Sequence, residues 1–298
     1  MRLTLALDDL LELRHQARGL GIASRHPVNT ALSGLYRSIF KGQGMDFEAV
    51  RAYQFGDEIR HMDWRVTART GSAHMKVFHE ERQRSLMLCV DVGASMQFGT
   101  RGTFKSIQAM RCVALLGWSA LYNQDKIGGV IFGGEKIHMV RPQQGQRNLW
   151  RFLRKLSDSH EVSDKTPLVK ILDRLNRIAP TGSPIVIVAN FNQDIQPLVY
   201  GLGKLSQGHQ LLLIPIDDPA EKNLAMMGKV QFMDNQGQRL DVNTSDARGQ
   251  QAYFELWQQR RQRLIALSRR FAIALLPIST DDDVRQRLLA GLYQLTHK

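Results

Sequence analysis

The stretch that decides the fold reads Ser85-Leu-Met-Leu-Cys-Val-Asp91-Val-Gly93-Ala-Ser95-Met-Gln97. Its apolar run ends at a carboxylate and a Gly-Ala-Ser turn, and helical spacing of apolar residues follows from residue 104 to residue 122. This pattern predicts a buried strand that leads into a helix. Because open parallel sheets bind ligands beyond the carboxyl ends of their strands, Asp91 and Ser95 are expected where a site would be built.

Asp91, Gly93 and Ser95 are spaced two residues apart. If the chain stays extended, positions with this spacing face the same side of the predicted crevice. One interpretation is therefore a binding site that these positions line. The alternative is that Asp91 only caps the turn after the strand.

From Leu86 onward, predicted strands alternate with predicted helices. The strands are expected at 126–132 and 136–141, which form a hairpin around two glycines, and at 184–191, 210–217 and 271–276. The helices are expected at 146–157, 167–178, 247–270 and from residue 283, and a small surface hairpin is expected at 230–242. This order predicts a doubly wound, mostly parallel α/β sheet with a β-hairpin insertion.

The predicted sheet domain spans residues 85–298. Residues 1–84 are expected to form an N-terminal helix at 5–18 and an arm, which together pack on the sheet domain. The arm carries a block of interleaved Arg, Asp, Tyr and Trp at residues 51–71. Such a block suggests bidentate ion pairs with aromatic stacking, for which the planar guanidinium is suited. A catalytic role for Asp57, His61 and Asp63 is disfavoured, since no nucleophile or metal-ligand spacing accompanies them.

The chain is strongly basic, with 298 residues, a formal net charge of +12 and a 43% hydrophobic content. Surplus positive charge suits nucleic acid or an acidic membrane surface, so peripheral membrane contact stays open. The basic residues are scattered, however, and no recognised nucleic-acid-binding motif accompanies them. We therefore expect no nucleic-acid partner.

The apolar runs are short of the roughly 18 residues that a membrane-spanning helix needs. The apolar region at the start of the chain is also too short for a signal peptide. A cytoplasmic location is therefore the expectation. Cys89 and Cys112 fall in the strand and helix patterns, and both are expected as buried thiols.

The block Gly56-Asp57-x-x-Arg60-x-x-Asp63-Trp64-x-x-x-Ala68-Arg69-Thr-Gly71, together with the later segment from Val77 through Val90-Asp91-x-x-x-Ser95-Met96, resembles the bacterial domain-of-unknown-function 58 family. The resemblance runs from about Met45 to Glu221, and it is weaker from there to the end. Members of that family look like von Willebrand factor type A domains and are commonly encoded beside MoxR-type AAA+ ATPases. The resemblance thus implies that fold and a role as a partner or adaptor.

The same resemblance implies a metal-ion-dependent adhesion site with the signature Asp-x-Ser-x-Ser at Asp91, Gly93 and Ser95. It aligns Thr166 with the second-loop metal ligand, although an N-cap role before Pro167 would explain this threonine equally well. Asn190 stands where family members usually have Asp. Because Gly93 and Asn190 depart from the pattern, Asp91 is the only carboxylate at the expected positions, and Mg²⁺ binding is expected to be weak or absent.

The candidate metal positions are therefore Asp91, Ser95, Thr166 and Asn190, in a degenerate site. The candidate partner contacts are Asp91, Gly93, Ser95 and Thr166.

The expected function is a non-enzymatic protein-interaction module that works with a MoxR-type AAA+ ATPase or with the client of that ATPase. The sequence contains no phosphate-binding loop and no dinucleotide-binding motif. Asp217 and Asp218 are a possible acid and base, but an Asp-Asp-Pro sequence at a strand end is more typical of a turn. The alternatives are a basic nucleic-acid-binding protein and an uncharacterised hydrolase.

Overall fold

The computed structural model describes residues 5–17, 47–54, 62–78, 85–159, 167–192, 194–233 and 239–296. The chain divides into two compact units, of which one comprises residues 1–40 and 85–298 and the other residues 41–84. The second segment of the larger unit begins at the predicted start of the sheet domain. The units are described separately.

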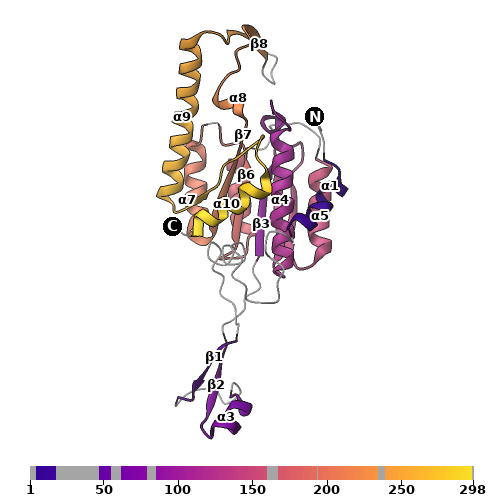
Figure 1. Cartoon of the computed structure of the whole chain (residues 1–298), viewed down its shortest axis with the longest axis vertical. Helices are drawn as coiled ribbons and strands as arrows, with labels where there is room; N and C mark the ends of the chain where they lie inside the picture. Colours follow the sequence, from indigo (N-terminus) through magenta and orange to yellow (C-terminus); the bar gives the residue numbers. More distant parts are fainter. Residues whose placement is uncertain are drawn as a thin grey trace. The chain divides into compact units, whose positions relative to one another are not determined.

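The larger unit is built on a seven-stranded sheet in the order β10-β7-β6-β3-β4-β5, with β11 also paired to β7 (Figure 1). Its strands are β3 Ser85–Asp91, β4 Lys126–Phe132, β5 His138–Gln143, β6 Pro184–Ala189, β7 Gln210–Asp217, β10 Ala274–Leu275 and β11 Ile278–Ser279. All neighbouring pairs are parallel except β4 and β5. The predicted doubly wound, mostly parallel sheet is confirmed.

The strand order reverses between β3 and β6. From β3 the chain builds β4 and β5 on one side, and it then crosses to build β6 and β7 on the other side. Val90 pairs with Val188 in the parallel register of β3 and β6, so the residues that follow these two strands are neighbours. A reversal of this kind is the point at which open α/β sheets bind ligands.

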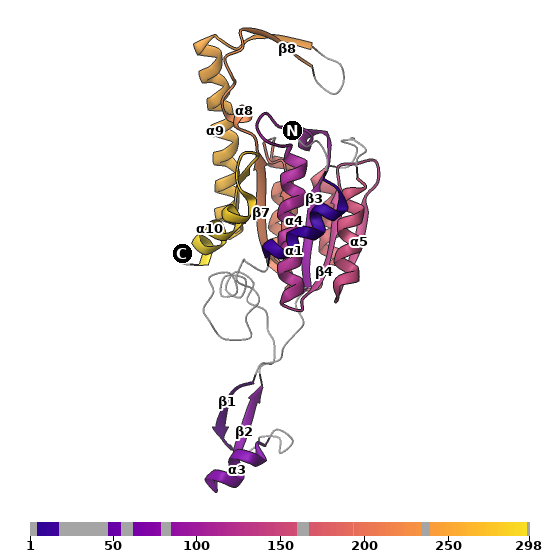
Figure 2. The ribbon, with the colours of Figure 1, turned by 45° about the vertical axis from the view of Figure 1, so that its right-hand side comes forward.

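Helices cover both faces of the sheet (Figures 1 and 2). They are α1 Leu7–Ala17, α4 Lys105–Tyr122, α5 Gln146–Ser157, α6 Leu168–Ile178, α7 Val199–Gly208, α9 Ala247–Arg270 and α10 Val284–Thr296. Leu86, Leu88 and Val90 join the core under α1, α4, α5 and α10, whereas Met87 and Cys89 join the core under α6, α7 and α9. Because successive side chains of a strand point to opposite faces, the fully buried β3 contributes to both cores.

Helix α1 lies across α4 toward α5 (Figure 2). The indole Nε1 of Trp118 donates a hydrogen bond to the carbonyl oxygen of Leu10 at 3.0 Å, and the Tyr122 hydroxyl donates to that of Arg14 at 3.1 Å. The predicted N-terminal helix is confirmed, and it belongs to the sheet unit.

The smaller unit, residues 41–84, contains an antiparallel hairpin of β1 Phe47–Ala52 and β2 His74–Phe78 and a short helix, α3 Trp64–Thr70. The Asp63 carboxylate caps α3, because it accepts hydrogen bonds from the backbone N–H groups of Arg65 and Val66, each at 3.1 Å. Packing of this block on the sheet domain stays a prediction.

Part of the Arg, Asp and Trp block lies at the surface of its unit, since Trp64 is 65% exposed and Arg69 is also exposed. Bidentate ion pairs and aromatic stacking within the block stay predictions. Asp57 and His61 lie outside the described residues. The side-chain hydrogen bonds described for Asp63 are local, since they come from backbone N–H groups of the next helical turn.

The predicted strand at 271–276 is also corrected. Residue Phe271 ends α9, Ala272 adopts a positive φ of 52°, and only Ala274–Leu275 pair as β10 before β11 resumes at Ile278. Pro277 separates the two short strands, and proline has no N–H to donate to a sheet. The run is therefore interrupted where the sequence pattern looked continuous.

The predicted hairpin insertion is confirmed as β8 Lys229–Met233 and β9 Arg239–Asn243, which follow a short helix, α8 Pro219–Lys222. Cys89 and Cys112 are buried as predicted. Burial raises the pKa of both thiols, and the nearby Asp91 raises that of Cys89 further. In the described part of the chain, every helix is too short or too polar to cross a lipid bilayer.

Candidate functional site

Two equivalent turns form the strand-end pair, Asp91 and Asn190, beside the reversal of strand order. The Asp91 Oδ1 atom accepts a hydrogen bond from the Gly93 N–H at 2.8 Å, and the Asn190 Oδ1 atom accepts one from the Asn192 N–H at 2.9 Å. Each side chain is 8% exposed. Side-chain capping of the backbone two residues on is typical of Asx turns, so Asp91 does cap the turn that follows its strand.

Gly133, which follows β4, packs tightly against the first of these turns. It has a φ of +91°, and a Cβ atom at this position would lie 2.4 Å from Asp91 Oδ1 and 2.4 Å from the Gly93 nitrogen. The Val92 N–H donates to the Phe132 carbonyl oxygen at 2.8 Å and holds the two loops together. The conformation at Asp91 therefore depends on a glycine in the neighbouring loop.

We expect Gly133→Ala to lower the free energy of unfolding by about 2–4 kcal/mol, because it combines a left-handed backbone with a clash. Gly182→Ala is the matched control, since Gly182 has a φ of +79° but no heavy atom within 4 Å of its Cβ position. Urea unfolding followed by circular dichroism measures both. Equal losses in the two variants would contradict the close approach at Asp91.

The other predicted site residues are placed differently. Ser95 is exposed in the short 3-10 helix Ala94–Met96, and Gly93 is buried beside Asp91. Thr166 lies outside the described residues. The structure thus brings together Asp91, Gly93 and Asn190 of the predicted set.

A divalent cation fits the strand-end pair poorly. The described residues contain no group of three or more His, Cys, Asp or Glu side chains that could hold a metal ion. Of the two residues in the strand-end pair, only Asp91 carries a carboxylate, and affinity for Mg²⁺ rises with the negative charge of the ligands. Both Oδ1 atoms already accept backbone hydrogen bonds. The strand-end pair therefore provides no basis for a metal-dependent reaction.

A buried polar network lies at the end of β7. The Asp218 carboxylate accepts hydrogen bonds from the Thr100 N–H at 2.8 Å, the Thr100 hydroxyl at 2.5 Å, the Thr280 hydroxyl at 2.6 Å and the Ala220 N–H at 2.9 Å. Burial alone would raise the pKa of Asp218, but these hydrogen bonds outweigh it and hold the pKa below 3.8. Asp218 therefore joins three segments of the chain as an ionised group.

Asp217 and Asp218 do not act as a pair. Asp217 forms an ion pair with Arg261 of α9, and burial nevertheless raises the pKa of Asp217. Asp218 begins α8 in a capping box with Glu221, as the turn interpretation predicts. The structure gives each carboxylate a separate structural partner.

The network also contains Lys105, whose side chain is completely buried. Its Nζ atom lies 2.6 Å from the Glu221 Oε1 atom and 5.9 Å from the centre of the Phe98 ring. Sequence analysis missed this residue. The Asp-Pro-x-Glu pattern at residues 218–221 signals the capping box, whereas no local pattern marks a lysine in the first turn of α4 as buried.

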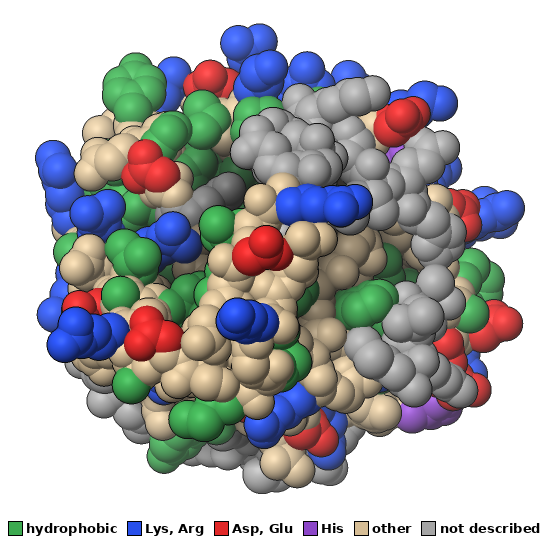
Figure 3. Space-filling view, turned by 90° about the horizontal axis from the view of Figure 1, so that it is seen from above, with side chains coloured by type: hydrophobic (Ala, Val, Ile, Leu, Met, Phe, Trp, Pro, Cys, Tyr) green, Lys and Arg blue, Asp and Glu red, His purple; other side chains and the backbone are tan. Residues whose placement is uncertain are grey.

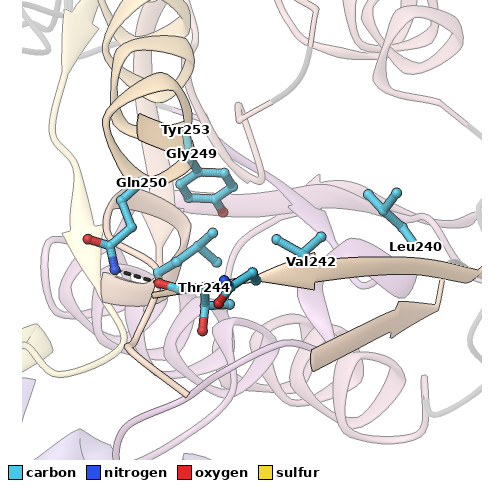
Figure 4. Close-up of a pocket in the computed structure, with 8 residues that line it drawn as sticks. Leu240, Val242, Thr244, Gly249, Gln250 and Tyr253 are labelled. Carbon is cyan, nitrogen blue, oxygen red and sulfur yellow. Dashed lines mark hydrogen bonds between the residues drawn. The ribbon is translucent and has the colours of Figure 1, made fainter. Parts of the chain in front are cut away.

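A pocket of about 330 Å³ lies between β9 and the first turns of α9 (Figure 4). Thr244 anchors it, because its hydroxyl donates to the Gly228 carbonyl at 2.9 Å and its own carbonyl accepts from the Gln250 side chain at 2.7 Å. Leu240, Val242 and Tyr253 line it with mostly apolar surface. No charged side chain lines it, so it offers shape rather than acid–base chemistry.

Positive charge is distributed around the end of the molecule shown in Figure 3. Lys and Arg side chains appear on several sides of this view, with Asp, Glu and apolar side chains between them. This arrangement agrees with the scattered basic residues of the sequence.

The family model described as "Protein of unknown function DUF58" matches residues 49–263. The uncharacterized proteins Rv1480 of Mycobacterium tuberculosis and Mb1516 of Mycobacterium bovis are each 26% identical to this chain over 219 residues, which cover 73% of this chain and 69% of each relative.

Two solved structures show a weak likeness. The conserved hypothetical protein BatB from Bacteroides thetaiotaomicron matches with a TM-score of 0.44 and 10% identity, over 72% of this chain and 100% of that chain. A von Willebrand factor type A protein from Catenulispora acidiphila matches with a TM-score of 0.39 and 11% identity, over 74% of this chain and 43% of that chain. The strand order and pairing described above, rather than these likenesses, establish the fold.

Proposed function

We propose that this chain, which belongs to the DUF58 family of proteins of unknown function, is a protein-interaction module without turnover of its own. It acts as an adaptor for a MoxR-type AAA+ ATPase or for the client of that ATPase. The observation that supports the proposal is the strand-end pair, where Asp91 and Asn190 stand at the reversal of strand order. This edge of an open sheet is the usual place for ligand recognition.

The polar groups at this edge favour recognition over catalysis. Asp91 and Asn190 are held by their own backbone turns, and the described residues place no nucleophile and base around either of them as acyl or phosphoryl transfer requires. Since the sequence has no phosphate-binding loop, the proposal assigns nucleotide hydrolysis to the partner. The net charge of +12 would speed encounter with an acidic partner and make the complex sensitive to salt.

The proposal includes a degenerate metal site, and it predicts that millimolar Mg²⁺ leaves the melting temperature nearly unchanged. A ligand at about 100 times its dissociation constant would stabilise the native state by about 2.7 kcal/mol, which a thermal melt detects. Differential scanning calorimetry with and without Mg²⁺ or Mn²⁺ measures the effect. A rise of several degrees that Asp91→Ala abolishes would show an intact metal site.

A pull-down with a purified MoxR-type ATPase, at low and raised salt and in each nucleotide state, tests the adaptor role. We expect a complex that Ser95→Ala and Thr166→Ala weaken by about tenfold and that Ser245→Ala, at another exposed serine, leaves unchanged.

Binding of fluorescent DNA is measured beside the pull-down, because the positive charge also suits nucleic acid. Tight, salt-dependent DNA binding without any ATPase complex would reject the adaptor role and favour the nucleic-acid alternative.

A further inference from the structure

A second surface, separate from the strand-end pair, combines an apolar pocket with concentrated positive charge. The pocket, of about 320 Å³, lies between the end of α1, the end of α4 and the start of α5. Trp118, Leu121 and Tyr122 of α4 line it, and Arg14, His15 and Gln146 lie around it. We call this region the α1–α5 pocket.

The walls of the pocket expose apolar surface because their polar atoms are used elsewhere. The Trp118 N–H and the Tyr122 hydroxyl both donate to carbonyl oxygens of α1, at 3.0 Å and 3.1 Å. The same bonds fix α1 over α4, so the pocket is formed before any partner arrives. A preformed apolar recess suits an apolar side chain better than a polar group.

The helix at the edge of the pocket is strongly basic. Helix α5 contains Arg147, Arg151, Arg154 and Lys155 and no acidic residue. The three arginines are exposed, and their spacing of four and three residues places them on one face of the helix. Among the described residues, Asp158 contacts this helix, with its Oδ2 atom 3.9 Å from the Arg154 Nε atom and both side chains more than 70% exposed.

An exposed tryptophan lies beside this basic face. Trp150 is 43% exposed, and it is three residues from Arg147 and four from Arg154, so it neighbours both on the helix surface. Tryptophan and arginine are the residues most enriched where binding energy concentrates in protein interfaces. Gln146, which lines the α1–α5 pocket, directly precedes Arg147 in the chain, so the basic face of α5 begins next to the pocket.

We propose that this surface docks an acidic segment of a partner protein, with an apolar side chain of that segment in the α1–α5 pocket. Carboxylates of the segment pair with Arg147 and Arg151, for which guanidinium groups provide bidentate geometry. A second copy of the chain is disfavoured, since a two-fold contact would bring identical basic helices together. Nucleic acid is disfavoured because the Trp118, Leu121 and Tyr122 walls form an apolar recess, which suits an apolar side chain better than a polar base edge.

The proposal does not rest on the adaptor role, and it is tested with the full chain and defined probes. The first probe is a fluorescein-labelled glutamate-rich peptide with one central phenylalanine, and the second is the same peptide with serine in place of that phenylalanine. Fluorescence anisotropy gives the dissociation constants. We expect the phenylalanine peptide to bind about tenfold more tightly, and its affinity to fall as salt rises.

The double variant Arg147→Gln with Arg151→Gln is expected to weaken binding of the phenylalanine peptide by at least about tenfold. The matched control is Arg174→Gln with Arg177→Gln, which removes two exposed arginines from α6, on the other face of the sheet. This control is expected to bind like the parent. Thermal melts of both variants confirm that the fold is retained.

Several outcomes would overturn the proposal. The first is that the parent chain does not detectably bind the phenylalanine peptide. The second is that the α6 control variant loses as much affinity for this peptide as the α5 variant, which would indicate unspecific charge attraction. A third is that a DNA oligonucleotide of equal charge binds more tightly than the peptide and that the α5 variant no longer binds it. That result would assign the surface to nucleic acid. A dimer seen by light scattering and lost in the same variant would assign it to a second copy.

Discussion

Replacement of Lys105 by Met is expected to lower the free energy of unfolding by about 3–5 kcal/mol. The Lys105 side chain has no exposed surface, and its Nζ atom lies 2.6 Å from Glu221, which is 13% exposed. Removing the ammonium group leaves the Glu221 carboxylate in a largely dry environment beside the raised-pKa carboxyl of Asp217. Loss of one partner of a buried pair costs far more than the pair contributes, because the remaining charge lacks compensation.

Chemical denaturation of Lys105→Met, Glu221→Gln and the double variant measures the coupling between the two residues. The double variant should recover part of the loss, since it no longer contains an uncompensated charge. The exposed pair of Arg154 and Asp158 provides the control, and Asp158→Asn should change stability by no more than about 0.5 kcal/mol. If Lys105→Met unfolds like the parent, the ion pair does not hold this part of the fold.

The sequence predicted most elements of the sheet domain because their signals are local. The buried run that ends at Asp91 and the helical spacing of residues 247–270 depend only on neighbours within a few positions. The family resemblance placed Asp91 and Asn190 in one site, and the parallel pairing of β3 with β6 accounts for it, since the ends of adjacent parallel strands meet at one edge. Ala272 shows the limit, because its left-handed backbone interrupts an apolar run without any glycine or asparagine to signal it.

Residues whose environment depends on distant contacts were beyond sequence reasoning. The hydrogen bond of Lys105 to Glu221 spans 116 positions, and that of Asp218 to Thr100 spans 118. The helical pattern of α4 identified Lys105 only as a polar residue in a first turn. The 65% exposure of Trp64 was likewise not evident from the residues around it in the sequence. Such contacts depend on which segments the completed fold brings together.

Replacement of Asp218 by Asn is expected to lower the free energy of unfolding by about 2–4 kcal/mol at neutral pH. The carboxylate accepts four hydrogen bonds from Thr100, Thr280 and Ala220, and hydrogen bonds to charged groups contribute about 1.5–3 kcal/mol each. Asparagine has one oxygen acceptor, and its amide nitrogen would face a donor. The variant therefore leaves the backbone N–H of Thr100 or of Ala220 without its acceptor, beside a residue 218 that is 1% exposed.

The pH dependence distinguishes this network from simple loss of packing. The folded-state pKa of Asp218 lies below 3.8, so the folded protein binds the proton more weakly than the unfolded chain does. Its stabilisation is complete above the unfolded value and is lost as pH falls through the folded value. The stability gap between the parent and Asp218→Asn should therefore narrow on acidification. Asp217 acts with the opposite sign, because its raised pKa favours the protonated folded state, but it is present in both proteins. Thermal melts of the two proteins from about pH 7 to about pH 2 measure the gap, and a gap that stays constant or widens would contradict an ionised, hydrogen-bonded Asp218.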